Sequence, residues 1–433
     1  MKIFKLSLTT FVTRTFLAGI SFITGLIILK KLQPDGSGIY SLAVLIPSTV
    51  TLLCNLGLGL ANTYYSAKKK FPINIILGNS ILYSIIVGIS LIIVITIGFE
   101  IGLLKPYLKI EEKYFLSAIW TIPILLMSNF FISILQGLGN IIKCNIINFA
   151  RAVFFLILLI IALFLFGTNI QSVILIWSIS WIITVIMGYF DITKITKSKI
   201  GFSLSVFKES LSYGLKGYPA NIFSFLNYRL DMFLINYFLG DYQLGLYFGA
   251  VLFAETLWFL PNAVGFVLFP KTATQDKEQS VNLTEKITRL IGTVVIPFGL
   301  GLIALFYICI HIFIPKYAGS FIPFLILLPG IVIFSMDMIV SNYFLGEGKQ
   351  LYNSIGAGLM CILNVILNFI LIPKWGINGA AFVSSITYIF GTIYSFIVFK
   401  KLTGEKITSL LFLQKSDYKD VRDAIKSLKD EIK

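Results

Sequence analysis

Residues 73–98 read INIILGNSILYSIIVGISLIIVITIG, a run without Asp, Glu, Lys or Arg. About 20 apolar residues suffice to carry a helix across the hydrocarbon core of a bilayer. Backbone N–H and C=O groups find no partners in lipid, so a lipid-exposed run of this length has to bond internally as an α-helix. The stretch therefore predicts a transmembrane helix.

Similar apolar runs recur along the whole chain, separated by clusters of Gly, Pro, Lys or Asn. The runs are residues 8–30, 39–61, 73–98, 114–135, 146–166, 171–190, 211–239, 245–269, 288–314, 320–345, 352–372 and 378–399. The 433-residue chain is 57% hydrophobic and 13% charged, which is too apolar for a soluble protein of this length. We predict an all-α, multi-pass membrane protein with about 12 transmembrane helices.

Positive charge is distributed unevenly between the two sides that this topology defines. Lys68 to Lys70, the connection at residues 191–210 and the C-terminal tail all fall on one side and are rich in Lys. Cytoplasmic loops of membrane proteins are enriched in Lys and Arg, so both termini are predicted to be cytoplasmic. The net charge of +15 then reflects topology, and nucleic acid is not an expected partner.

The chain also repeats itself at an offset of 207 to 209 residues. Residues 38–45, GIYSLAVL, match residues 245–252, GLYFGAVL, and two glycine-containing loops match at nearly the same offset. The repeat predicts two six-helix halves. An even number of helices gives both halves the same sense, so their pseudo-two-fold axis should lie along the membrane normal, and the halves can rock against each other.

We place the N-terminal six-helix bundle at residues 1–198 and the C-terminal bundle at residues 199–404. Residues 405–433 then form a cytoplasmic tail, in which apolar residues recur at helical spacing behind Ser416, a residue type that favours the N-cap position. This pattern predicts an amphipathic helix.

Four cations interrupt runs that are otherwise apolar: Arg14, Arg151, Lys216 and Arg229. A charge at membrane depth is costly unless it faces the protein interior or a water-filled path, so each is a candidate site residue. Together they predict that an anion binds within the membrane.

Helical spacing suggests how two of these cations are oriented. Thr10, Arg14 and Ser21 share one face of the first helix, which predicts either an aqueous lining or close helix packing with Arg14 on a backbone carbonyl. A second face, on the run 211–239, is expected to carry Lys216, Asn227 and Asp231. Lys216 and Asp231 are therefore candidates for the same lumen.

The other two cations each have two interpretations. Arg229 lies two residues from Asp231 and so points elsewhere. It either faces the lumen or forms a structural ion pair with Glu255 or Asp337. Arg151 either faces the lumen or extends to the cytoplasmic surface.

Three acids are embedded among apolar residues: Asp231, Glu255 and Asp337. They either bind a coupling ion, H⁺ or Na⁺, or compensate the embedded cations. The cysteines form no CxxC pair and His311 is the one histidine, so neither a metal site nor another cofactor is predicted. The sequence lacks the GxxxxGK[ST] and GxSxG motifs, and we do not predict an enzyme.

Residues 32–43, LQPDGSGIYSLA, resemble the first-loop signature of the polysaccharide biosynthesis flippases. These flippases are the Wzx-like branch of the multidrug/oligosaccharidyl-lipid/polysaccharide exporter superfamily. Residues 229–235, RLDMFLI, and 376–381, GINGAA, are similar to further segments of that family. The resemblance extends over residues 1 to about 400.

The resemblance implies a flippase of the bacterial cytoplasmic membrane. It would move undecaprenyl-pyrophosphate-linked oligosaccharide repeat units to the outer leaflet by alternating access, for a surface polysaccharide such as O-antigen or capsule. A polysaccharide polymerase and glycosyltransferases are candidate partners. Lumen cations at Arg14, Lys216 and Arg229 would hold the pyrophosphate.

Sugar hydroxyls have their own candidate residues, which are Thr10, Ser21, Asn227, Asn364 and Asn368. Polar groups of this kind equally serve to hold helices together. A cation-coupled multidrug exporter of the same superfamily is the alternative function, and a membrane scaffold without transport is a third.

Overall fold

The computed structural model describes residues 2–104, 106, 109–165, 167, 169–196, 198–272, 275–414 and 417. Among these, only the backbone is described at residues 2–12, 165, 217, 266–267 and 269–271. The described residues form helices and connections, with no strand. The helices are α1 (Lys2–Asn55), α2 (Leu58–Lys68), α3 (Ile73–Glu100), α4 (Glu112–Ile119), α5 (Ile122–Gly137), α6 (Ile141–Leu165), α7 (Ile170–Thr196), α8 (Leu204–Gly217), α9 (Pro219–Leu239), α10 (Asp241–Ala254), η1 (Glu255–Trp258), α11 (Phe259–Thr272), α12 (Lys277–Ile312), η2 (Pro315–Ser320), α13 (Phe321–Gly346), α14 (Gln350–Thr403) and α15 (Thr408–Leu411).

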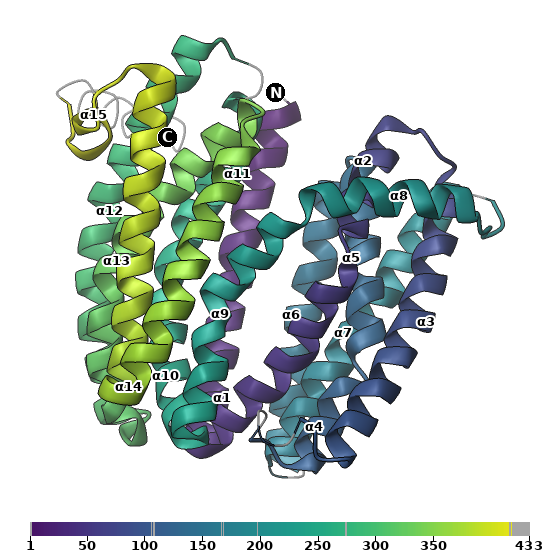
Figure 1. The fold of residues 1–433 in the computed structure, drawn as a ribbon, viewed down its shortest axis with the longest axis horizontal. Helices are drawn as coiled ribbons and strands as arrows, with labels where there is room; N and C mark the ends of the chain where they lie inside the picture. Colours follow the sequence, from purple (N-terminus) through teal and green to yellow (C-terminus); the bar gives the residue numbers. More distant parts are fainter. Residues whose placement is uncertain are drawn as a thin grey trace, which may run out of the picture.

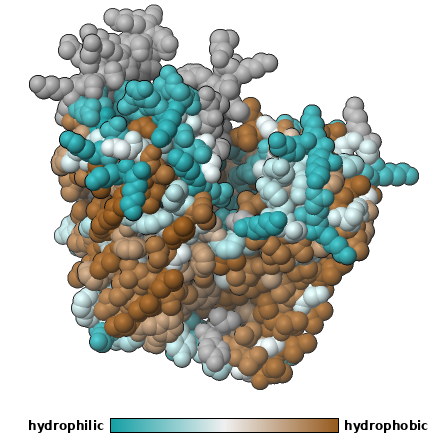
Figure 2. Space-filling model, turned by 45° about the horizontal axis from the view of Figure 1, so that its top comes forward, coloured by the Kyte–Doolittle hydropathy of each residue, from teal (hydrophilic) through white to brown (hydrophobic). Residues whose placement is uncertain are grey.

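The predicted class, an all-α multi-pass membrane protein, is confirmed. Within the described residues, nine helical stretches are long and apolar enough to cross a membrane. Two of these stretches are bent into two legs each, and α9 adds another helix of 21 residues, which accounts for the predicted twelve crossings. Apolar side chains cover the flanks of the molecule below a more polar end (Figure 2).

Two long helices each contain a sharp bend at a residue with positive φ. In α1 the bend is at Gln33 (φ 60°), directly before Pro34, and it divides the helix into residues 2–32 and 34–55. In α14 the bend is at Gly376 (φ 59°), three residues after Pro373. Proline removes a helical hydrogen bond, and a left-handed residue reverses the chain direction locally. Each long helix therefore crosses the membrane twice.

The predicted seventh run, residues 211–239, is wrong as a single helix. One helix ends before Tyr218 and the next, α9, begins at Pro219. Proline is favoured at the first position of a helix. The preceding residues belong to α8, whose N-cap Ser203 accepts a hydrogen bond from the Val206 N–H. Lys216 therefore lies on a different helix from Asn227 and Asp231.

Helix α8 packs against α2 and α3 of the N-terminal bundle. The rings of Tyr64 and Tyr213 stack with centroids 4.5 Å apart, and the Asn79 side chain donates to the Ser203 carbonyl at 3.0 Å. Gly214 lies so close to the backbone of Gly57 that neither position has room for a Cβ. The connection between the halves is thus fixed to the first half up to Gly217.

The two bundles stand side by side and diverge toward the end where α2, α8 and α15 lie, called the α8 end below (Figure 1). They meet at the opposite end, near α4, called the α4 end. Among the described residues, three hydrogen bonds join them there. Tyr317 Oη donates to Ser37 Oγ at 2.7 Å, Lys316 Nζ donates to Gln33 Oε1 at 2.6 Å, and Lys109 Nζ donates to the Tyr237 carbonyl at 2.6 Å. The molecule is therefore closed at the α4 end.

The internal repeat forms this closure. Gly38 and Gly245 are the repeat-related glycines, and each lies against the backbone of the other half. A Cβ at Gly38 would be 1.9 Å from the Asp241 carbonyl oxygen, and one at Gly245 would be 1.8 Å from the Pro34 carbonyl oxygen. The repeat is thus retained where two backbones must touch.

The start of the predicted tail is tied to the C-terminal bundle. Asp417 accepts hydrogen bonds from Arg289 Nε at 2.8 Å and from Arg289 Nη2 at 3.0 Å, and both side chains are buried. This charged hydrogen bond lowers the pKa of Asp417. The predicted helix behind Ser416 lies outside the described residues.

We expect Gly38→Ala and Gly245→Ala to loosen the closed end, because a methyl group at either position forces two backbones apart. The measurement is bismaleimide cross-linking between Gln33→Cys and Lys316→Cys in a background without the native cysteines. Cross-linking should fall several-fold in each alanine variant.

Gly301→Ala is the matched control, because a Cβ at Gly301 meets nothing within 4 Å. Equal cross-linking in the control and in both test variants would contradict the assigned role of the glycine contact.

Candidate functional site

A cavity of about 300 Å³ lies between the two halves and contains Arg14. The lining residues are Thr13, Arg14, Leu17, Ala18 and Ser21 from α1, Asn145 and Asn148 from α6, and Phe259, Asn262 and Ala263 from α11. We call it the Arg14 cavity. No Asp or Glu occurs among the described residues that line it. It therefore combines one guanidinium with neutral amides and hydroxyls, a set that suits an anion.

Helix geometry brings this lining together. Arg14, Ala18 and Ser21 follow spacings of four and three on the first leg of α1, so they share one face, as the sequence predicted. Thr10, on the same predicted face, has a side chain outside the described part of the protein. Arg14 is half-buried.

The first leg of α1 packs against the second half rather than the first. The Phe22 ring meets the Phe253 ring edge-on at 5.1 Å, and Gly25 lies directly against Leu252. Arg14 is therefore held on the C-terminal side of the cleft, facing amides from α6 on the N-terminal side.

An apolar groove of about 380 Å³ adjoins the Arg14 cavity and shares Ala18, Phe259 and Ala263 with it. The remaining lining is Thr15, Gly19, Phe22, Thr256, Leu260, Phe298, Leu302 and Leu305. Phe298 and Leu305 are exposed on α12, on the apolar flank of the molecule. A polar cavity with a cation thus adjoins an apolar groove at the lipid-facing surface.

Arg229 does not face a lumen, because it is paired with Glu255. The two guanidinium nitrogens donate to the two carboxylate oxygens at 2.8 and 3.0 Å, a bidentate pair between α9 and η1. Both side chains are half-buried. A pair with this geometry neutralises both charges at membrane depth. Of the two interpretations of Arg229, the structure supports the ion pair, and Glu255 is the partner.

Arg151 and Lys216 also lie outside the Arg14 cavity. The Arg151 guanidinium lies over the Trp181 ring, 4.2 Å from its centroid, which is a cation–π contact within the N-terminal bundle. It therefore does not extend to the surface. Lys216 is exposed in the last turn of α8, near the chain's passage into α9. The structure thus does not gather the four predicted cations at one place.

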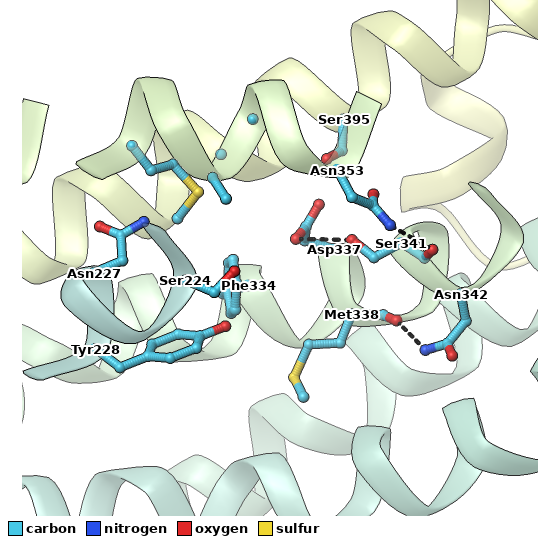
Figure 3. Close-up of a pocket in the computed structure, with 14 residues that line it drawn as sticks. Ser224, Asn227, Tyr228, Phe334, Asp337, Met338, Ser341, Asn342, Asn353 and Ser395 are labelled. Atoms are coloured by element: carbon cyan, nitrogen blue, oxygen red, sulfur yellow. Dashed lines mark hydrogen bonds between the residues drawn. The ribbon is translucent and has the colours of Figure 1, made fainter. Parts of the chain in front are cut away.

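The C-terminal bundle contains a polar cavity of about 270 Å³, lined by residues of α9, α13 and both legs of α14 (Figure 3). Asp337 lies in it: the Ser341 hydroxyl donates to Asp337 Oδ2 at 3.4 Å, while Asp337 Oδ1 has no hydrogen-bond partner among the described residues. Asn227 Oδ1 and Asn353 Oδ1 line the same cavity and are likewise unpartnered. Three open oxygen acceptors thus surround one space.

Asp231, by contrast, has its hydrogen bonds satisfied. Its Oδ1 accepts from the Met232 N–H at 2.8 Å. The hydroxyls of Tyr247 and Ser384 both donate to its Oδ2, the latter at 3.1 Å. Of the three embedded acids, Glu255 is paired with a cation and Asp231 is saturated by donors. Asp337 alone among them presents an open oxygen to a cavity.

The predicted sugar-contacting residues are scattered. Ser21 lines the Arg14 cavity, and Asn227 lines the Asp337 cavity. Asn364 and Asn368 are fully buried and bonded to each other at 2.8 Å. The sequence reasoning missed Asn145, Asn148 and Asn262. A search for amides at helical spacing within apolar runs, as was done for cations, would have found Asn145 and Asn148.

Comparisons with known proteins agree with this architecture. The lipid II flippase MurJ, in an inward closed conformation, superposes with a TM-score of 0.74 at 16% identity, covering 90% of this chain and 87% of that one. An inward-facing multidrug resistance MATE family transporter of the MOP superfamily gives 0.70 at 15% identity, covering 92% and 98%. A MOP superfamily transporter from Pyrococcus furiosus gives 0.68 at 16% identity, covering 94% and 96%. These likenesses establish the fold.

Sequence comparison establishes the family. An uncharacterized membrane protein of Methanocaldococcus jannaschii is 29% identical over 223 residues, which are 48% of this chain and 43% of that relative. The match thus spans less than half of the relative's length. The family described as "Polysaccharide biosynthesis protein" matches residues 3–275, well over half of the sequence. The chain is therefore a multi-pass membrane protein that belongs to the polysaccharide biosynthesis protein family.

Proposed function

We propose that the protein moves undecaprenyl-pyrophosphate-linked oligosaccharide repeat units from the cytoplasmic to the outer leaflet of the bacterial membrane. One observation carries this proposal: the Arg14 cavity adjoins an apolar groove on the lipid-facing flank and shares three lining residues with it. Such a substrate has a charged pyrophosphate joined directly to a long hydrocarbon chain. The pyrophosphate would bind Arg14 while the chain lies in the groove.

The structure has the form expected for one state of an alternating-access cycle. The α4 end is closed by the Gly38 and Gly245 contacts, and the bundles diverge at the α8 end (Figure 1). Lys68 to Lys70 lie beside the α8 end, which supports a cytoplasmic position for it. The state described would then receive substrate from the cytoplasmic leaflet. A membrane potential negative inside favours outward movement of an anion by about 2.3 kcal/mol per charge per 100 mV.

The alternative, a multidrug exporter for cationic drugs, has less support. A cation-binding cavity needs acids, and the described lining of the Arg14 cavity contains none. The acid that remains open, Asp337, lies inside the C-terminal bundle rather than between the bundles. We propose that it binds the coupling ion, H⁺ or Na⁺, because carboxylate, amide and hydroxyl oxygens around one cavity suit a small cation or a proton.

Arg14→Gln should weaken binding of undecaprenyl pyrophosphate by about 10- to 150-fold, since a hydrogen bond to a charged group contributes about 1.5–3 kcal/mol. Binding is measured on the purified protein in detergent. Lys374→Gln removes an exposed cation that lines none of these cavities and should leave affinity unchanged. Full affinity and transport in the Arg14 variant would contradict the proposal.

Gly19→Leu should block the groove without disturbing the fold, because a Cβ at Gly19 meets nothing within 4 Å. Transport of the lipid-linked sugar in proteoliposomes should fall at least tenfold, while the protein level in the membrane stays the same. Gly301→Leu adds the same side chain at an equally open position on α12 that does not line the groove, and it should be neutral. Equal transport in both variants would exclude this path for the hydrocarbon chain.

Asp337→Asn keeps the size of the side chain and removes its charge. Transport in proteoliposomes should become independent of an imposed Na⁺ or proton gradient, whereas Glu278→Gln, which removes an exposed acid, should keep the dependence. A variant that responds to the gradient like the parent protein would show that the coupling ion binds elsewhere.

A further inference from the structure

A second cavity between the halves, of about 350 Å³, has a different chemistry from the Arg14 cavity. It is lined by Ser48, Leu52 and Asn55 from the second leg of α1, Gly59, Leu60 and Thr63 from α2, Asn129, Ser133 and Gln136 from α5, Tyr218, and Asn221 and Phe225 from α9. We call it the amide cavity. No charged residue occurs in this lining, so among the described residues it presents a neutral, hydrogen-bonding surface.

The internal repeat relates the two cavities. The Arg14 cavity uses the first membrane crossing of the first half and the second crossing of the second half. The amide cavity uses the second crossing of the first half, in α1, and the first crossing of the second half, α9. Each cavity also has a wall from the first half, α6 in the Arg14 cavity and α5 in the amide cavity. An operation that exchanges the halves exchanges the two pairs of crossings, so these pairs lie on opposite sides of the pseudo-two-fold axis. One side of the cleft carries a cation and the other carries amides.

The amides in this cavity are available for a ligand. The side chains of Asn129, Gln136 and Asn221 are exposed, and none of them makes a hydrogen bond within the described part of the protein. Each carboxamide offers two donors and an acceptor oxygen with two lone pairs. Carbohydrate hydroxyls both donate and accept, so three open amides form a set that matches them.

The other polar groups of the cavity are already bonded and fix its shape. The hydroxyls of Thr63 and Ser133 donate to backbone carbonyls at 3.1 and 2.8 Å, and the Tyr218 hydroxyl donates to the Leu52 carbonyl. Asn55 is buried and accepts from the Gly59 N–H at 3.2 Å. The rings of Tyr218 and Phe225 add apolar faces. The cavity therefore combines a lining held by internal hydrogen bonds with three amide side chains that are open to a ligand. Small-molecule sites typically have this composition, a preformed apolar surface with a few precisely placed polar groups.

We infer that the amide cavity binds the sugars of the substrate through Asn129, Gln136 and Asn221, and that it selects neutral sugars. This inference rests on the proposed function, since it assigns a second subsite to the same lipid-linked substrate. The pyrophosphate is held at Arg14 on one side of the axis and the oligosaccharide extends to the other side. A carboxylated sugar would find no cation in the amide cavity and would lose its hydration there without compensation.

The test compares the affinities of purified protein for undecaprenyl pyrophosphate and for the same lipid carrying neutral di- and trisaccharides. In the parent protein the sugars should tighten binding by about tenfold or more, consistent with several hydrogen bonds of about 1 kcal/mol each. The combined Asn129→Ala, Gln136→Ala and Asn221→Ala variant should lose this gain and keep its affinity for the lipid without sugar. A lipid carrying a hexuronic acid should show no gain in either protein.

The control variant combines Gln279→Ala, Asn282→Ala and Gln350→Ala, three exposed amides outside the amide cavity, and it should retain the gain from the sugars. The inference is overturned if no neutral sugar tightens binding to the parent protein, if the test variant keeps the gain, or if the test variant loses affinity for both lipids equally. Failure of the proposed function has another signature, because the parent protein would then bind none of the lipids, or Arg14→Gln would bind undecaprenyl pyrophosphate unchanged.

Discussion

The cost of a charge inside the membrane governs the interior of this protein. The embedded cations meet that cost in different ways. Arg229 is neutralised by Glu255 at 2.8 and 3.0 Å, and Arg151 lies on the Trp181 ring. Arg14 lines a cavity in which no Asp or Glu occurs among the described lining residues. Of these three cations, Arg14 lines a cavity, and the other two are held by contacts within the fold.

The second constraint is the glycine contact at the α4 end. Backbones that touch at Gly38 and Gly245 leave no room for a side chain, so the halves can meet closely there. The bundles diverge from this contact (Figure 1), and the Arg14 and amide cavities lie in the space between them. The closure and the binding space are thus two consequences of one packing arrangement, which is what a rocking transporter requires.

Much of the fold was predictable because it depends on length and hydropathy alone. The crossings and the membrane class come from patterns that a lipid environment imposes on any sequence, and the repeat comes from matched segments at a nearly constant offset. The break at Tyr218 was not found, because the run 211–239 stays apolar on average across it. Pro219 was the signal in the sequence that could have indicated a new helix. Because the helix does end there, Lys216 belongs to α8 and not to the helix that carries Asn227 and Asp231.

The candidate site was less predictable, because it depends on which helices face each other. Arg14 and Ser21 were placed on one face correctly, since they belong to one helix. The sequence offered Glu255 as one of two possible partners of Arg229. It could not decide between them, because Glu255 lies 26 positions away on another helix. Asn145, Asn148 and Asn262 reach the same cavity from two further helices, and no local pattern relates them to Arg14.

The two halves share a fold but not a surface chemistry. Their pseudo-symmetry would give equal linings on both sides of the axis, yet one side has Arg14 beside an apolar groove and the other has open amides beside two aromatic rings. A lipid-linked oligosaccharide has the same asymmetry, with a hydrocarbon chain and an anion at one end and neutral hydroxyls at the other. A duplicated scaffold can bind such a molecule across its axis only if the two copies have diverged in this way. The repeat therefore remains strict at Gly38 and Gly245, where backbones touch, while the lining of the cleft differs between the halves.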